Sequence, residues 1–121
     1  MNTTNLTSIA LRVCNMDAMV AFYSAAFDIK FKDVDTFGLP SKFGEFKGIT
    51  LKFVPIRDED EVDFENYPIH QLGFSISDVE KVINIALKHG GKLEGDITRK
   101  DGKVNAAVRD PDGNTIELYS E

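Results

Sequence analysis

The feature that most constrains the fold of this chain is an internal repeat. A pattern of strand, helix, strand and hairpin occurs twice, and the two copies match residue by residue. Ile9 matches Leu72, Asn15 matches Asp78 and Asp17 matches Glu80, each at a separation of 63 residues. Residues 48–53 match residues 113–118 at a separation of 65 residues. Repeats of this length are typical of supersecondary units that pack side by side. We therefore predict two βαβββ units, at about 6–55 and 69–121, joined by a linker at about 56–68.

Local patterns predict the elements of each unit. Alternating apolar residues predict strands at 9–13, 29–34 and 69–76, and 38–40 breaks the pattern. In the first unit Asn15 is the expected N-cap of a helix over 16–27, and in the second Ser77 and Glu80 form a capping box before a helix that ends near His89. A hairpin is expected to turn at 47–48, and a further strand at 92–97.

The stretch 110–119 is the most specific part of the second unit. Its residues 110–113 are Asp, Pro, Asp and Gly, which suit a type I turn between two strands of a hairpin. In the strand that follows, Ile116 and Leu118 point to one face, while Glu117 and Tyr119 point to the other. Glu117 is therefore expected on the face of a sheet that lines a cleft.

Composition narrows the class of protein. The 121 residues carry a formal net charge of −6, which argues against nucleic acid or an anionic membrane as a partner. The apolar runs are too short to span a bilayer, the first residues are polar and unlike a signal peptide, and Cys14 has no second cysteine with which to pair. We expect a single cytoplasmic domain over residues 1–121.

At this point the chain resembles the vicinal-oxygen-chelate superfamily, which includes glyoxalase I, extradiol dioxygenases and the bleomycin and fosfomycin resistance proteins. The resemblance lies in the paired βαβββ units, in Ala21-Phe22-Tyr23 of the first helix, and in Asp110-Pro111-Asp112-Gly113-Asn114 followed by Ile116-Glu117-Leu118. The resemblance covers nearly the whole chain. It implies an α+β fold in which curved mixed β-sheets surround a cleft, within one chain or between two, with the helices outside.

The resemblance also implies where a metal ion is held in metal-bearing relatives, with one ligand from the first strand and one from the last strand of each unit. Those places fall on Ser8 and Lys52 in the first unit and on Gln71 and Glu117 in the second. A hydroxyl is a weak ligand for a divalent ion and an ammonium repels one. We therefore predict no cofactor, and an ion pair between Lys52 and Glu117 in place of a metal.

The leading hypothesis is a protein that binds a small organic molecule without a metal and forms a homodimer. Arg12, Ser75 and Tyr119 are expected to line the same cleft as the four positions above, because they share their strand faces.

Two alternatives remain open. The first is a metal-dependent glyoxalase-like lyase or isomerase, or an extradiol dioxygenase, in which zinc, nickel, manganese or iron is bound by Gln71 and Glu117 with His70 as a further candidate. The second is a protein-interaction module that uses the six acidic residues among residues 57–65. The sequence leaves open whether the chain is an enzyme and does not identify the ligand.

Overall fold

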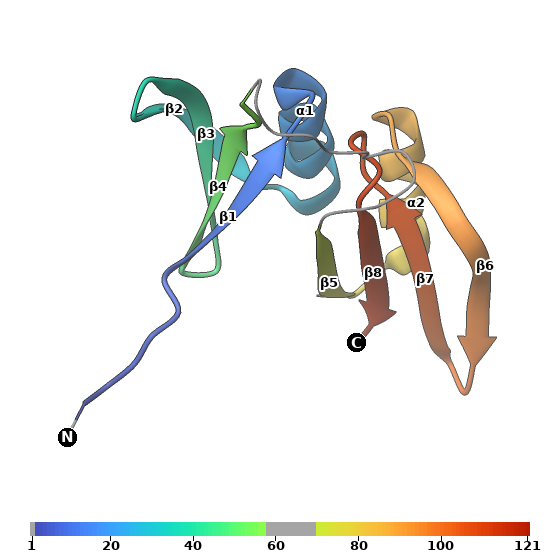
Figure 1. The fold of residues 1–121 in the computed structure, drawn as a ribbon. Helices are drawn as coiled ribbons and strands as arrows, with labels where there is room; N and C mark the ends of the chain where they lie inside the picture. The colour runs from blue at the N-terminus through green and yellow to red at the C-terminus, as the bar shows by residue number, and fades with distance from the viewer. Residues whose placement is uncertain (1, 58–69) are drawn as a thin grey trace.

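The computed structural model describes residues 2–57 and 70–121, and in them the two predicted units follow each other along the chain (Figure 1). The first unit consists of β1 (Ser8–Val13), α1 (Met16–Phe27), β2 (Lys30–Thr36), β3 (Leu39–Phe46) and β4 (Ile49–Pro55). The second consists of β5 (Gln71–Ile76), α2 (Val79–Lys88), β6 (Lys92–Lys100), β7 (Lys103–Arg109) and β8 (Thr115–Ser120).

Each unit forms one mixed sheet with the same topology. The strand orders are β1-β4-β3-β2 and β5-β8-β7-β6. The first and last strands of each unit are parallel, and the other neighbours are antiparallel. Ile9 lies opposite Leu51, and its repeat partner Leu72 lies opposite Ile116. The predicted α+β fold of two βαβββ units is confirmed, down to the register of the repeat.

The helix starts follow the repeat rather than the predicted capping box. Asn15 caps α1 as expected, since its side chain accepts a hydrogen bond from the backbone N–H of Ala18 at 3.2 Å. The N-cap of α2 is Asp78, the repeat partner of Asn15, and not Ser77. The Asp78 carboxylate lies 3.1 Å from the N–H of Lys81 and satisfies one of the free donors of the first turn.

The strand β3 includes Leu39 and Pro40, where the sequence predicted a break in the strand pattern. The turn between β2 and β3 uses Phe37 and Gly38, both with positive φ, so Leu39 and Pro40 already pair with β2. Proline is tolerated there because the pairing with β4 starts only at Lys42, so the missing N–H interrupts no hydrogen bond on that side.

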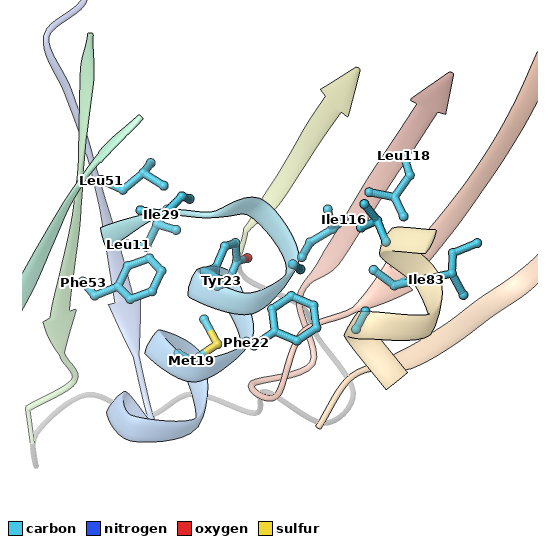
Figure 2. Close-up of a cluster of buried hydrophobic side chains, with 14 of the residues drawn as sticks. Leu11, Met19, Phe22, Tyr23, Ile29, Leu51, Phe53, Ile83, Ile116 and Leu118 are labelled. Carbon is cyan, nitrogen blue, oxygen red and sulfur yellow. The ribbon is translucent and has the colours of Figure 1, made fainter. Parts of the chain in front are cut away.

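The core lies between the two sheets, where the helices meet (Figure 2). Tyr23 of α1 packs its ring against Phe53 of the first sheet, with the ring centroids 5.2 Å apart. Phe22, its neighbour on α1, belongs to the same buried cluster as Ile83 of α2 and Ile116 of the second sheet. Each sheet therefore turns its apolar face toward the helices and its polar face away from them. We call these polar faces the open faces.

Two further sequence predictions concern the acidic linker and the absence of a membrane-spanning segment. The acidic linker lies outside the described residues from residue 58 to its end. Within the described residues, no helix has the length and apolarity needed to cross a membrane.

Candidate functional site

The four predicted site residues of the second unit lie together on the open face of its sheet. Gln71 and Ser75 of β5 alternate with Gly73, and Glu117 and Tyr119 of β8 lie beside them in the parallel register. The amide Nε2 of Gln71 donates a hydrogen bond to the Glu117 carboxylate at 2.5 Å. Gly73 lies directly opposite Glu117, so no side chain covers the carboxylate from that strand. The face presents a carboxylate that is held in place by a neutral donor.

A second polar group on this face was not predicted from the sequence. The guanidinium of Arg109 donates from Nε to Glu94 at 3.2 Å, and the Thr115 hydroxyl donates to the same carboxylate at 2.9 Å. The sequence placed Glu94 in a strand but gave no register for it. The β6–β7 and β7–β8 pairings bring Glu94 opposite Ala107, and Ala107 opposite Glu117. Only those pairings could have identified Glu94 as part of the site.

The open face of the first sheet holds the other three predicted residues. Ser8 lies beside Thr50, and Lys52 lies between Phe43 and Ala10 in one row across the strands. The Lys52 ammonium lies over the Phe43 ring, 5.3 Å from its centroid. Arg12 lies two residues beyond Ala10 on the same strand, where its guanidinium donates to the carbonyl of Pro55 at 3.3 Å.

Both open faces carry more cations than carboxylates. Strand alternation places four cationic side chains and one carboxylate on the open face of the first sheet: Arg12, Lys30, Lys32, Lys52 and Glu45. It places four cations and two carboxylates on the second open face: Lys92, Lys100, Lys103, Arg109, Glu94 and Glu117. A strongly cationic sheet face is unexpected on a chain whose net charge is −6.

The predicted ion pair between Lys52 and Glu117 is not formed within the chain. In the described residues, the polar partner recorded for Glu117 is Gln71, and Lys52 contacts the Phe43 ring. The reason is the arrangement of layers. Because both helices lie between the sheets, the open faces that carry these two residues point away from a shared interior.

The residues at the implied metal positions fit a divalent ion poorly. Among the described residues there is no group of three or more His, Cys, Asp or Glu side chains that could hold a metal. Gln71 and Glu117 are adjacent and could supply two oxygen ligands, but Ser8 and Lys52 supply a weak ligand and a cation.

His70, the further metal candidate, lies just before β5 and is engaged elsewhere. Its ring Nε2 lies 3.2 Å from the backbone nitrogen of Arg12, and its own N–H donates to the Asn114 side chain at 3.0 Å. This side chain joins the end of β1 to the second unit. In this structure it is an edge histidine with a structural role.

The turn at 110–114 connects the two units. Asp110, Asp112 and Asn114 are at most 6% exposed. The Asp112 carboxylate accepts hydrogen bonds from the backbone N–H groups of Cys14, at 2.7 Å, and Asn15, at 3.0 Å, just before α1. Sequence analysis recognised the turn but missed this contact, because nothing in the local pattern indicates which distant backbone the carboxylate reaches.

Burial also changes the acidity of two groups at this turn. The Tyr23 hydroxyl donates to Asp110 at 2.9 Å. Burial, reinforced by the neighbouring Asp110 carboxylate, raises the pKa of Tyr23 well above its ordinary value. Burial likewise raises the pKa of Asp110, although hydrogen bonds from Asn114 and Tyr23 oppose the rise. Both groups are enclosed and paired, so we assign them to holding the units together.

Comparison with known proteins agrees with this architecture. Residues 5–118 match the family model described as Glyoxalase/Bleomycin resistance protein/Dioxygenase superfamily. No curated protein matches the sequence.

Several solved structures have the same fold. A glyoxalase family protein from Bacillus cereus superposes with a TM-score of 0.79 at 13% identity, covering 100% of this chain and 96% of that one. A glyoxalase-related enzyme from Fulvimarina pelagi gives 0.74 at 19% identity, with 98% and 89% covered. A glyoxalase/bleomycin resistance protein/dioxygenase family enzyme from Burkholderia phytofirmans gives 0.74 at 16%, with 97% and 98% covered. At these identities the likeness concerns the fold alone.

Proposed function

The chain belongs to the Glyoxalase/Bleomycin resistance protein/Dioxygenase superfamily, and from this premise we propose that it binds a small organic molecule on its open sheet faces without using a metal ion. The proposal does not include a chemical step. The superfamily contains both enzymes and binding proteins, so the function has to be argued from the residues of the site.

The observation that carries the proposal is the position of Lys52. It occupies the middle of the first open face, between Phe43 and Ala10, at a place where the family resemblance implies a metal ligand. An ammonium about 4 Å from a divalent cation is repelled by roughly 8 kcal/mol at an effective dielectric constant near 20. Two neighbouring oxygen ligands such as Gln71 and Glu117 offer little to offset that cost. A neutral or anionic organic ligand meets no such repulsion.

We further propose that a second copy of the chain completes the site. The open faces of one chain point away from its helices, so neither face covers the other. A two-fold symmetric pair can place the first open face of each protomer against the second open face of its partner and so form two equivalent clefts. Such a pair would also cover sheet edges that are open in the single chain.

Charge supports this pairing of faces. The middle row of the first open face, defined by the strand registers, consists of Lys32, Phe43, Lys52 and Ala10. The middle row of the second consists of Glu94, Ala107, Glu117 and Gly73. Two cations on one row would then face two carboxylates on the other, and oppositely charged rows favour the correct register of an interface. In this arrangement Lys52 faces Glu117 of the other protomer across the cleft, and the ligand lies between them.

A thermal-shift screen over metabolites and antibiotics tests the proposed binding. A ligand at about 100 times its dissociation constant adds about 2.7 kcal/mol to the stability of the folded protein. Ser75 is exposed on the second open face, and we expect Ser75→Trp to abolish the shift produced by a hit compound. Lys81→Trp, on the exposed side of α2, is the matched control and should keep the shift. Stabilisation that survives Ser75→Trp would place the ligand elsewhere.

A further inference from the structure

We propose that the ligand of this cleft is an organic anion, bound through its acidic group by the cations of the first open face and through its apolar part by the residues among them. This inference rests on the proposed function and adds the class of ligand to it.

Charge is separated across the first sheet. Its open face carries a net charge of three positive units, from four cations and Glu45. On the helix-facing side of the same sheet, β2 carries Asp33 and Asp35, and Lys42 pairs with Asp33. An acidic chain that gathers its cations on one sheet face raises the local concentration of anions there.

Two lysines flank Phe43 on the first open face. Lys32 and Lys52 lie on either side of it in the middle row, and Ala10 follows Lys52. Alanine is too short to cover its neighbour, and Lys52 keeps part of its surface exposed. Among the described residues, neither lysine forms an ion pair with a carboxylate. Two ammonium groups flanking one aromatic ring can bind an acidic group while the ring contacts an apolar body.

The second open face does not neutralise this charge. Its two carboxylates already have partners within the chain: Glu94 is held by Arg109 and Thr115, and Glu117 by Gln71. Its cations also outnumber its carboxylates, with Lys92, Lys100, Lys103 and Arg109 against Glu94 and Glu117. A cleft made from both faces therefore keeps the positive charge of the first.

Paired ligands of the same shape test the inference. Nitrogen-15-labelled wild-type protein is titrated with 3-phenylpropanoate, phenyl phosphate and the neutral 3-phenylpropanamide, each to millimolar concentration, and amide shifts are followed by NMR. We expect both anions to shift the backbone signals of β3 and β4 and the neutral amide to bind at least tenfold more weakly, about 1.4 kcal/mol. Lys52→Met and Lys32→Met should each weaken the anions by a similar factor, whereas Lys81→Met, which removes an exposed charge on α2, should not.

The outcomes separate this inference from the function on which it rests. Equal binding of the anions and the amide at β3 and β4 would overturn the anion inference and leave the proposed binding function intact. Anion binding that Lys52→Met and Lys32→Met leave unchanged would also overturn it. Failure of every probe to shift any signal of the first open face would overturn the anion inference, whereas the proposed function is overturned only if the thermal-shift screen also finds no ligand.

Discussion

The hydroxyl of Tyr23, on the first helix, donates a hydrogen bond of 2.9 Å to Asp110, in the last turn of the second unit. Both residues are almost completely buried, at 1% and 3% exposed. The same carboxylate also accepts from the backbone N–H and the side-chain amide of Asn114. A buried carboxylate is stable only when such donors surround it. The contact therefore fixes how the two units, and with them the two open faces, are oriented.

We expect Tyr23→Phe to destabilise the protein by about 1.5 to 3 kcal/mol, because it removes one donor from a buried charged acceptor. Urea unfolding should show a lower midpoint with an unchanged slope. Tyr119→Phe is the control: Tyr119 is 42% exposed, and its loss of a hydroxyl should change stability little. Equal stability of Tyr23→Phe and wild type would show that the hydrogen bond makes no net contribution.

Stability should fall at alkaline pH because of the same residue. The pKa of Tyr23 is raised in the folded protein above its ordinary value of 10.0, mainly by burial and then by Asp110. Above pH 10 the unfolded chain therefore releases this proton while the folded protein retains it. The stabilisation is complete below pH 10 and is lost as pH rises, with a slope of up to about 1.4 kcal/mol per pH unit. Urea unfolding from pH 8 to 11 should show this slope in wild type and a shallower one in Tyr23→Phe. Parallel curves would contradict the assignment.

Asp112→Ala should be more damaging than removal of an exposed aspartate. It deprives the N–H groups of Cys14 and Asn15 of their acceptor at the start of α1, which we expect to cost about 2 kcal/mol or more. The matched control is Asp96→Ala, on an exposed part of β6. Thermal unfolding of the two variants measures the difference, and similar losses in both would rule out a specific contact.

Charge reversal tests the proposed dimer. Light scattering of wild type at micromolar concentration should give about twice 13.5 kDa. Lys52→Glu and Glu117→Lys should each weaken association by about 2 kcal/mol or more, since each places like charges opposite one another. The double variant should restore the dimer. A wild-type monomer, or single variants that associate as strongly as wild type, would exclude this interface.

Calorimetric titration with zinc and nickel tests the metal-free proposal. We expect no stoichiometric binding by wild type. Ser8→His combined with Lys52→Glu would provide His, Glu, Gln and Glu at the four implied positions, a set of nitrogen and oxygen ligands that suits zinc, nickel or manganese. This double variant should bind one ion per site, and the ion should restore the dimer that Lys52→Glu weakens. Tight one-to-one binding by wild type, lost in Glu117→Gln, would instead support the metal-dependent enzyme.

The sequence predicted those features that depend on neighbours along the chain. Alternation correctly assigned Glu117 and Tyr119 to the face opposite Ile116 and Leu118, because successive residues of a strand point to opposite sides. The residue-by-residue repeat is preserved in the parallel pairs, where Ile9 opposite Leu51 corresponds to Leu72 opposite Ile116. The capping motif misplaced the N-cap of the second helix by one residue, since Asp78 and not Ser77 caps it. Strand alternation and helix capping both depend on residues close together in the sequence, and the repeat applies them once in each unit.

Tertiary structure alone decided how the units meet. Nothing in the local pattern tells that Asp110 and Asp112 reach across to Tyr23 and to the start of α1. Packing between apolar faces that are distant in the sequence likewise decides on which side of each sheet the helices lie. That packing separates Lys52 from Glu117 within one chain, whereas the sequence had paired them. The sequence thus determined on which side of its own strand a residue such as Glu117 points, because that follows from alternation between neighbours. The pairing between strands and the buried contacts between units decided which residues, Glu94 among them, come together on each open face.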